Sequence, residues 1–202
     1  MAIFLHHGDL PATVRFSGSV AVDTETMGLN LHRDRLCLVQ LSAGDGDAHL
    51  VQIAPEVDAP NLKALFTDAS VVKIFHYARF DVGMIKRNLG VDCAPLFCTK
   101  IASKLCRTNT DRHGLKDLCR DLLGVELSKE QQTSDWGAPA PSAAQQKYAA
   151  NDVLYLHELK AKLEALLARE GRTELALATI AFLNTRAALD LAGWPDEDIF
   201  AH

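Results

Sequence analysis

Residues 19–25, Ser-Val-Ala-Val-Asp-Thr-Glu, are the stretch of sequence that decides the fold. A short apolar run that ends in polar residues predicts a buried β-strand. Side chains two positions apart on a strand point to the same face of the sheet. Asp23 and Glu25 are therefore predicted to lie together near the end of this strand.

Four further strands are predicted downstream of this one. Their apolar runs cover residues 35–42, 48–53, 71–75 and 95–98. The sequence Gly44-Asp45-Gly46-Asp47 is typical of a hairpin turn and predicts that the first two of these strands pair with each other. Helices are predicted over residues 61–66 and about 78–88, with Gly90 ending the second helix.

The chain is predicted to be mostly helical from Thr99 onward. Gly171 is expected to separate a long helix from another over residues 172–191, and a non-helical tail follows. Strands followed by helices indicate an α/β protein with a mixed five-stranded sheet flanked by helices and a helical C-terminal half. No linker or internal repeat interrupts the pattern, so residues 1–202 are expected to form a single domain without additional C-terminal helical domains.

Composition narrows the class of protein. The 202 residues are 48% hydrophobic and 23% charged, which suits one compact domain. No apolar run approaches the roughly 20 residues needed to cross a bilayer, and the N-terminus lacks the features of a signal peptide. The five cysteines form no Cys-x-x-Cys pair, so buried free thiols are expected rather than a zinc site. We expect a cytoplasmic protein with no membrane association.

The charge of the chain is unevenly distributed. A formal net charge of -5 argues against a protein that coats long nucleic acid by bulk electrostatics. Segment 99–116, however, carries five basic side chains and only one acidic one. This basic segment suits contact with a few phosphates, and a solvated basic helix face explains it equally well.

Two further acids join Asp23 and Glu25. Asp81 ends the segment His76-Tyr77-Ala78-Arg79-Phe80-Asp81, and Tyr148 and Asp152 are four residues apart in a helical stretch, so they share a helix face. Four gathered carboxylates stay ionised only if a cation joins them. Oxygen-only ligands favour Mg²⁺ or Mn²⁺, which indicates phosphodiester hydrolysis. Each acid taken alone is equally well explained as an ordinary helix or loop residue.

The three motifs and their order resemble the DEDD superfamily of 3′–5′ exonucleases, in the subgroup with tyrosine in the third motif. Ribonuclease D belongs to this subgroup, on a ribonuclease H-like fold. The resemblance implies five catalytic residues: Asp23, Glu25, Asp81, Tyr148 and Asp152. None of these positions is substituted.

Within this family the chain resembles the nano-RNase C group, short bacterial relatives of ribonuclease D. The matching stretches are 21–26, 32–36, 97–105, 110–116, 134–136, 152–157 and 193–195. The resemblance implies a substrate of short RNA, above all dinucleotides, and a symmetric octameric ring. The aromatic residues Trp194 and Phe200 are then expected to dock one subunit on another.

The resemblance also implies two divalent metal ions, Mg²⁺ or Mn²⁺. One is expected on Asp23, Glu25 and Asp152, and the second on Asp23 and Asp81. Such a pair activates a water and stabilises the leaving 3′ oxygen, which yields nucleoside 5′-monophosphates. Tyr148, with an ordinary pKa near 10, is a poor base and is expected to orient the water.

The substrate is expected to contact a second set of residues. Leu29 matches a leucine that wedges against a terminal base in related oligoribonucleases, although inward packing of a turn residue is an equal alternative. His76 either shapes the site or is a satisfied junction histidine. A 5′ phosphate is expected at Arg112 and His113. The other candidates are Thr24 and Trp136, with Gln131, Gln132 and Ser134 in the same polar loop as Trp136.

The predicted function is a metal-dependent 3′–5′ exoribonuclease that acts on short oligoribonucleotides. Two alternatives stay open. A general exonuclease on longer RNA or on single- or double-stranded DNA needs the same hydrolytic residues. A non-catalytic module that binds nucleic acid or nucleotides is disfavoured, because clustered negative charge repels phosphates.

Overall fold

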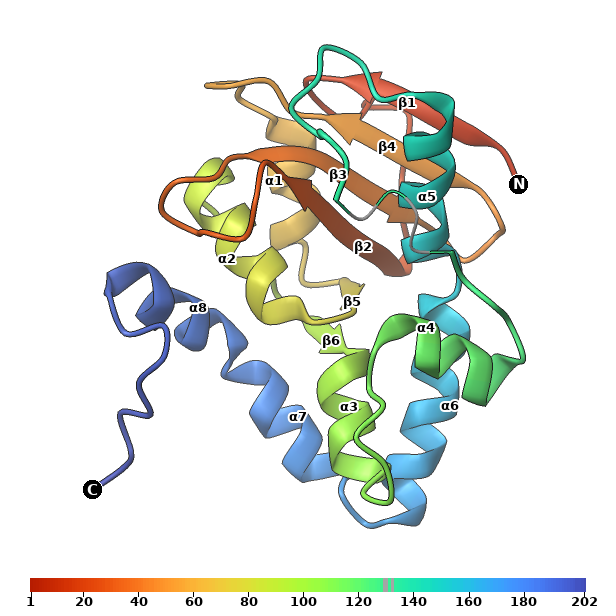
Figure 1. The fold of residues 1–202 in the computed structure, drawn as a ribbon, viewed down its shortest axis with the longest axis vertical. Coiled ribbons are helices and arrows are strands. Elements are labelled where there is room, and N and C mark those ends of the chain that lie inside the picture. Colours follow the sequence, from red (N-terminus) through yellow and green to blue (C-terminus); the bar gives the residue numbers. More distant parts are fainter. Residues whose placement is uncertain (129–130, 132) are drawn as a thin grey trace.

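The computed structural model describes residues 1–128, 131 and 133–202, and its centre is a six-stranded sheet (Figure 1). The strands are β1 (Ile3–His7), β2 (Gly18–Thr26), β3 (Leu36–Ser42), β4 (Ala48–Gln52), β5 (Val71–Phe75) and β6 (Leu96–Cys98). The helices are α1 (Pro60–Thr67), α2 (Ala78–Leu89), α3 (Thr99–Cys106), α4 (Leu115–Leu118), the π-helical turn η1 (Cys119–Leu123), α5 (Ala143–Leu154), α6 (Leu156–Arg169), α7 (Thr173–Ala181) and α8 (Leu183–Ala192).

The predicted fold class is confirmed, and the sheet is mixed. The strand order is β1-β4-β3-β2-β5-β6. The central strand β3 runs antiparallel to both of its neighbours, β2 and β4, and the 44–47 turn joins β3 to β4 as predicted. In contrast, β5 and β6 continue the sheet in parallel from β2. Helix α5 lies across β2, β3 and β4, while α1 and α2 lie behind the sheet in the view of Figure 1.

The strand count of five was wrong, because residues 3–7 form a sixth strand. This β1 pairs in parallel with β4 at one edge of the sheet. Its residues are only partly buried and include two histidines, so they lack the apolar alternation that marks an inner strand. Tertiary contacts hold the strand in place: His6 Nε2 and His49 Nδ1 are 3.0 Å apart, and Phe4 stacks on His49.

Helix α2 ends at Gly90 as predicted, and its charged residues suit the helix dipole. Asp81 lies in its first turn and Lys86 and Arg87 lie in its last turn, so each charge complements the helix dipole. Gly90 ends the helix with a φ of 73°, a left-handed conformation that glycine adopts without strain. All five cysteines of the chain are buried and unpaired, as expected for reduced thiols.

The C-terminal segment differs from the single predicted helix. It forms α7 and α8, which follow one another with an interruption only at Phe182. Together they span 20 residues, and an 18-residue window within them has a mean hydropathy of 1.3. By length and composition alone this segment can cross a membrane, so the expectation that no apolar run reaches that length was wrong.

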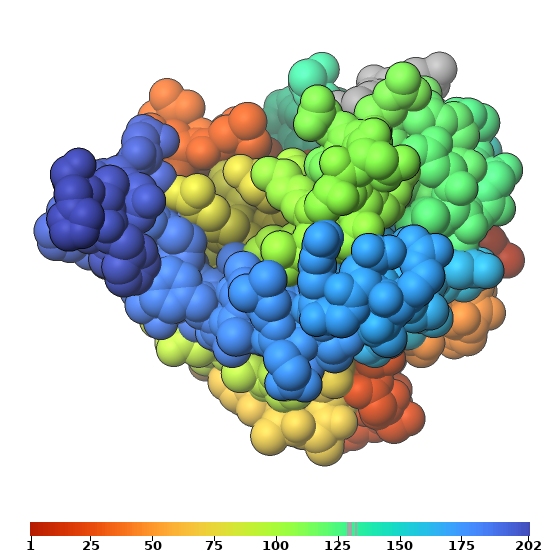
Figure 2. Space-filling view, turned by 90° about the horizontal axis from the view of Figure 1, so that it is seen from below, coloured from red at the N-terminus to blue at the C-terminus, as the bar shows by residue number. Residues whose placement is uncertain are grey.

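One such helix is weak evidence for a membrane span, because helices that pack on a core have the same composition. Residues Ala176, Ile180, Leu183 and Ala187 of this helix pair are buried in the main core. Its other side carries exposed apolar residues, among them Leu175, Leu177 and Phe182. Trp194, Ile199 and Phe200 are also exposed, in the tail that follows. Figure 2 shows this C-terminal segment, in dark blue, projecting from one side of the molecule.

A buried ion-pair network ties α8 to α2. Asp190 is only 2% exposed and accepts hydrogen bonds from Arg79 of α2 at 2.7 and 2.8 Å and from Arg186 of its own helix at 2.7 Å. The same two arginines donate to the carbonyls of Pro195 and Trp194. Burial alone raises the pKa of Asp190, but the two arginines outweigh it and hold this pKa below its ordinary value.

Replacing Asp190 by asparagine should destabilise the chain strongly. Asparagine has the same shape but leaves two partly buried guanidinium groups without a counter-charge. We expect the free energy of unfolding at pH 7 to fall by about 2–3 kcal/mol, below the 3–5 kcal/mol of a fully buried pair because Arg79 is partly exposed. Urea denaturation followed by circular dichroism measures this change.

The pH dependence and a second variant serve as controls. Because the folded-state pKa of Asp190 is lowered, its contribution is present above the ordinary value of 3.8 and is lost as the pH falls through the folded-state pKa. Glu164→Gln removes an exposed i,i+4 partner of Lys160 and should cost less than about 0.5 kcal/mol. Equal urea midpoints for Asp190→Asn and Glu164→Gln would contradict the role of the network.

Candidate active site

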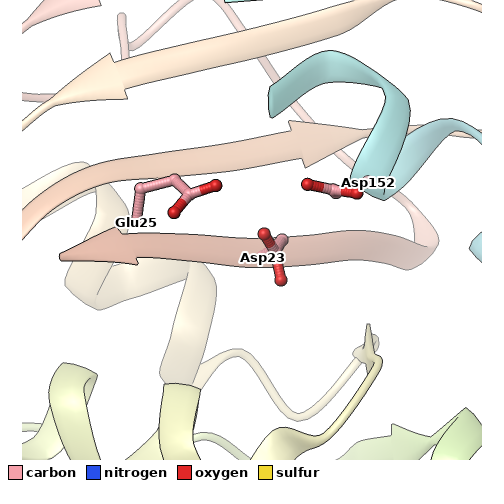
Figure 3. Close-up of side chains that lie close together, drawn as sticks. All are labelled: Asp23, Glu25 and Asp152. Carbon is pink, nitrogen blue, oxygen red and sulfur yellow. The ribbon is translucent and has the colours of Figure 1, made fainter. Parts of the chain in front are cut away.

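Three carboxylates converge at the end of β2. Asp23 and Glu25 project from the same face of this strand, and Asp152 comes from α5, which crosses it (Figure 3). One oxygen of each carboxylate lies within 4.8 Å of the other two. Within residues 1–128, 131 and 133–202, no other three acidic, histidine or cysteine side chains are grouped in this way.

Helix α5 is held in position by its first turn. Ser142 accepts from the backbone of Gln145, and the Gln145 side chain accepts in turn from the backbone of Ser142, so the helix begins with a capping box. The amide of Gln145 also donates to Ser134 Oγ at 3.1 Å and to the carbonyl of Asp135 at 3.0 Å. These bonds fix the loop before α5 to the helix that carries Tyr148 and Asp152.

The fourth carboxylate, Asp81, is oriented by Thr24. Asp81 lies in the first turn of α2 and is 4% exposed. Thr24 Oγ1 donates to Asp81 Oδ1 at 2.6 Å, so this residue, which was predicted to bind substrate and also lines the cavity, contacts a second acid. This bond links the first and second sequence motifs.

Sequence reasoning missed a buried glutamine beside Asp23. Gln40 lies opposite Asp23 in the β2–β3 register and is fully buried, and its Nε2 donates to Asp23 Oδ2 at 3.3 Å. A polar residue inside the apolar run Leu38-Val39-Gln40-Leu41 was the available signal, because buried amides need a specific partner.

All four carboxylates favour protons in the absence of a cation. Burial is the main cause, and the neighbouring acids add to it. Together they raise the pKa of Asp23 well above its ordinary value and that of Glu25 to about 9. Burial also raises the pKa values of Asp81 and Asp152 to about 7, although hydrogen bonds from Thr24 and Tyr148 oppose it.

Tyr148 lies beside the carboxylates with its hydroxyl protonated. Burial, followed by the charges of Asp152, Glu25 and Asp23, raises its pKa above the ordinary value. Trp136 packs behind Tyr148, with ring centroids 6.2 Å apart, and is 7% exposed. Trp136 therefore supports the tyrosine ring from the protein side rather than facing the cavity.

A cavity of about 360 Å³ opens over the carboxylates. It is lined by the four acids, Tyr148 and a further group of residues: Thr24, Thr26, Leu29, His76, Tyr77, Phe80, Lys100, Gly114, Leu115, Lys116, Asp117, Leu127 and Ser128. Leu29 is 84% exposed, so the alternative that it packs inward is wrong. A Cβ on Gly28 would lie 2.3 Å from Asp34 Oδ2, which is why the turn that presents Leu29 needs glycine.

His76 both satisfies its junction and faces this cavity. Thr99 donates its hydroxyl proton to the carbonyl of Phe75 at 3.1 Å, so His76 Nδ1, 2.9 Å from Thr99 Oγ1, has to be the donor between the two side chains. That assignment leaves Nε2 as an acceptor. Burial, with a smaller effect of Lys100, lowers the pKa of His76 to about 3, so the ring is neutral near pH 7.

Several predicted substrate residues are not brought to the cavity. Arg112 is exposed at the surface, and His113 is hydrogen-bonded to Ser103 at 2.8 Å. From the same basic segment, Lys100 and Lys116 line the cavity instead. Gln131 lines a smaller hollow that shares Tyr148 and Ser128 with this cavity, and Gln132 lies outside the described residues. The pattern of charges along the sequence does not reveal which of these side chains point into the cavity, because helix starts and loop geometry set their directions.

The acidic cluster has the donor set of a divalent-ion site. It offers carboxylate oxygens alone, which suit a hard cation better than a transition metal that prefers sulfur or imidazole. Its raised pKa values show that the bare cluster is electrostatically unfavourable when ionised, and a bound cation relieves that cost. Asp23, Glu25 and Asp152 are therefore able to hold one such ion.

Comparison with known proteins identifies a family for this site. A family model described as 3′–5′ exonuclease matches residues 9–168. Ribonuclease D of Granulibacter bethesdensis is 33% identical over 178 residues, which are 88% of this chain and 45% of that protein. The chain thus spans about half the length of the curated relatives that it matches.

Two solved structures are similar over nearly their whole length. Brucella melitensis NrnC bound to pGG is 55% identical, with a TM-score of 0.97, covering 100% of this chain and 99% of that one. Brucella melitensis NrnC with bound Mg²⁺ is 54% identical, with a TM-score of 0.95 and full coverage of both chains.

The stability of the metal-free protein should fall as the pH rises. The folded-state pKa values of the four acids lie above those of the unfolded chain, so their contribution is fully present below about pH 4 and is lost as the pH rises through about 7 to 9. We expect the thermal midpoint in a chelator to decrease between pH 5 and pH 9. Differential scanning fluorimetry across this range measures it.

Mg²⁺ should reverse this loss, with a larger rise in the midpoint at pH 8 than at pH 5, because protons compete with the ion at low pH. Asp23→Asn removes one charge at the centre of the cluster and should reduce both the pH dependence and the response to Mg²⁺. A flat metal-free profile from pH 5 to pH 9 in the parent protein would refute this account of the cluster.

Proposed function

The chain belongs to the family of 3′–5′ exonucleases that includes ribonuclease D and NrnC, and we propose that it degrades short oligoribonucleotides to nucleoside 5′-monophosphates. The observation that carries this proposal is the carboxylate cluster of Asp23, Glu25 and Asp152 at the base of a small cavity. Hydrolysis of a phosphodiester needs charge neutralisation and an activated water at one point, and such a cluster provides the place for both.

Two divalent ions are the proposed cofactors, Mg²⁺ or Mn²⁺. Asp23, Glu25 and Asp152 hold one ion, and Asp81 joins Asp23 for the second. When bound, such ions supply the acidity that deprotonates water and the positive charge that stabilises the leaving oxygen. The solved structure of NrnC with bound Mg²⁺ supports the choice of ion.

The side chains around the cluster have proposed roles of their own. The protonated hydroxyl of Tyr148 orients the attacking water, since its raised pKa excludes it as a base near pH 7. His76 Nε2 accepts a hydrogen bond from a ribose hydroxyl, and its lowered pKa keeps it an acceptor. Leu29, which is exposed at the cavity, packs against a terminal base.

A short substrate is favoured by the size and charge of the cavity. A volume of about 360 Å³ is near the lower end of small-ligand sites, which measure about 300–1,000 Å³. Lys100 and Lys116 add positive charge to its lining and suit the far phosphate of a short chain. Capping of that phosphate by Arg112 and His113 stays a prediction. The pGG molecule bound to Brucella melitensis NrnC supports a dinucleotide as the reference substrate.

The exposed apolar residues of α7, α8 and the tail support a homo-oligomer, for which the family resemblance implies an octameric ring. They form a C-terminal patch of Leu175, Leu177, Phe182, Trp194, Ile199 and Phe200. Exposed apolar groups of this extent are typical of protein interfaces. A cytoplasmic location is also proposed, since the five cysteines are unpaired and buried.

The decisive experiment measures hydrolysis against substrate length. End-labelled RNAs of two to about twenty nucleotides, with matched DNA single strands and duplexes, are incubated with Mg²⁺ or Mn²⁺. We expect kcat/KM to be highest for dinucleotides and to fall steeply beyond about three nucleotides, because the cavity is small. Rates independent of length would favour the general exonuclease.

Asp152→Ala is the matched control for this series. Mutation of a residue that only supports a metal ligand lowers metal affinity or activity by about 10–100-fold. Removal of a ligand itself should therefore lower kcat/KM by at least about 100-fold. The far-ultraviolet circular dichroism spectrum should stay unchanged. Hydrolysis by this variant at the parental rate would remove the carboxylate cluster from the mechanism.

The oligomer is tested with the double variant Trp194→Ser/Phe200→Ser. Loss of two large aromatics from the C-terminal patch should reduce the mass of the assembly, as measured by light scattering. Glu197→Gln, a change in the same tail that removes no apolar surface, should leave the mass unaltered. An unchanged mass in the double variant would rule out this patch as the contact.

A further inference from the structure

Tyr77 holds a backbone conformation that tyrosine rarely adopts. It follows β5 and precedes α2, with a φ of 66° and a ψ of 41°. In the described part of the chain, only Glu56 and Tyr77 combine a side chain with a positive φ. Glycine or asparagine fits this left-handed region with less strain. A bulky aromatic residue at such a position indicates a use for its side chain, because strained residues cluster at functional sites.

Burial does not explain this tyrosine. Its side chain is 49% exposed, whereas Phe80 in the next turn packs against the main core. The exposed ring instead lines the cavity that opens over the carboxylates. Tyr77 therefore presents an aromatic surface to the space in which a substrate of the proposed reaction has to lie.

Lys100 holds one face of the Tyr77 ring. Its Nζ lies 4.0 Å from the ring centroid, within the range of a cation–π contact. The sheet explains this approach: Phe75 pairs with Cys98, His76 next to it bonds Thr99, and Tyr77 then meets Lys100. In Figure 2 the olive-yellow atoms of segment 76–90 lie beside the green atoms of segment 99–115. The contact orients the ring, and about half of the Tyr77 side chain stays exposed.

The charge of Lys100 supports a use in the cavity. Burial and the neighbouring Lys104 lower the pKa of Lys100, and this residue sits in the first turn of α3, where the helix dipole disfavours a cation. An anionic ligand beside the ring relieves that cost. Nucleotides combine such an anion with a flat base, and base–aromatic stacking tolerates any base sequence because every base has a π-face.

We propose that Tyr77, oriented by Lys100, stacks on a nucleobase of the substrate and so makes binding depend on a base without selecting its identity. This inference rests on the proposed function, since it names a contact in the same cavity. It is separate from the contact proposed for Leu29, which comes from the turn after β2 and offers an aliphatic surface.

The test compares Tyr77→Asn with Tyr77→Phe on a 5′-phosphorylated RNA dinucleotide. Asparagine relieves the backbone strain and removes the ring, whereas phenylalanine keeps the ring. We expect Tyr77→Asn to raise KM about 10-fold, the low end of the range for one stacked base, with kcat changed less than about twofold. Its thermal midpoint should be equal to or higher than that of the parent. Tyr77→Phe should keep the parental KM.

Abasic dinucleotides identify the stacked base. Removal of the stacked base from the substrate should raise KM for the parent enzyme about as much as Tyr77→Asn raises KM for the intact dinucleotide. For the Tyr77→Asn variant, removal of that base should cause no further rise in KM. A parental KM for Tyr77→Asn, or an equal loss on every abasic analogue, overturns the stacking contact. A lowered thermal midpoint with an unchanged KM assigns Tyr77 a structural role and also overturns it.

The activity of the parent enzyme on substrates of different length tests the proposed function separately from the stacking contact. If the parent cuts the dinucleotide and Tyr77→Asn cuts it with the same KM, only the stacking contact fails. If the parent cuts longer strands and not the dinucleotide, the short-RNA proposal fails. The comparison of Tyr77→Asn with Tyr77→Phe on those longer strands then decides the stacking contact in the same way.

Discussion

The desolvation and mutual repulsion of four clustered carboxylates are the constraint on which the rest of the site depends. Burial raises the pKa of all four, Asp23, Glu25, Asp81 and Asp152, and neighbouring acids raise the pKa values of Asp23, Glu25 and Asp152 further. A flexible chain would relax by moving these groups apart. The protein prevents this by placing them on elements whose positions are set by hydrogen bonds and packing far from the carboxylates themselves.

Each of these elements is held by a different kind of contact. Strand β2 is central in the sheet, between β3 and β5, so its two acids cannot move without breaking backbone pairing on both sides. Helix α5 is fixed by the capping box of Ser142 and Gln145. Helix α2 is anchored at its start, where Thr24 bonds Asp81, and through Arg79, which pairs with Asp190 of α8. The C-terminal helices thus support the helix that carries the second motif.

The outward-facing side of the C-terminal helices α7 and α8 is apolar and exposed. Apolar residues of α7, α8 and the tail are exposed in the isolated chain, although their neighbours on the inner side belong to the core. A helix that is apolar on both sides needs a partner on each. Apolar residues on two sides give the segment the length and hydropathy of a membrane helix, although it carries the charged pair of Arg186 and Asp190 near its end.

The sequence by itself determined the fold class, five of the six strands and the acids that gather at the end of β2. Apolar runs, turn residues and helical spacing are local signals, and the three motifs keep their order along the chain. Tertiary structure alone decided the edge strand β1, which lacks an apolar pattern, and the contact of Thr24 with Asp81. It also decided which cations face the cavity. Lys100 and Lys116 do, and Arg112 does not, because the direction of a side chain depends on how its helix or loop packs against the sheet.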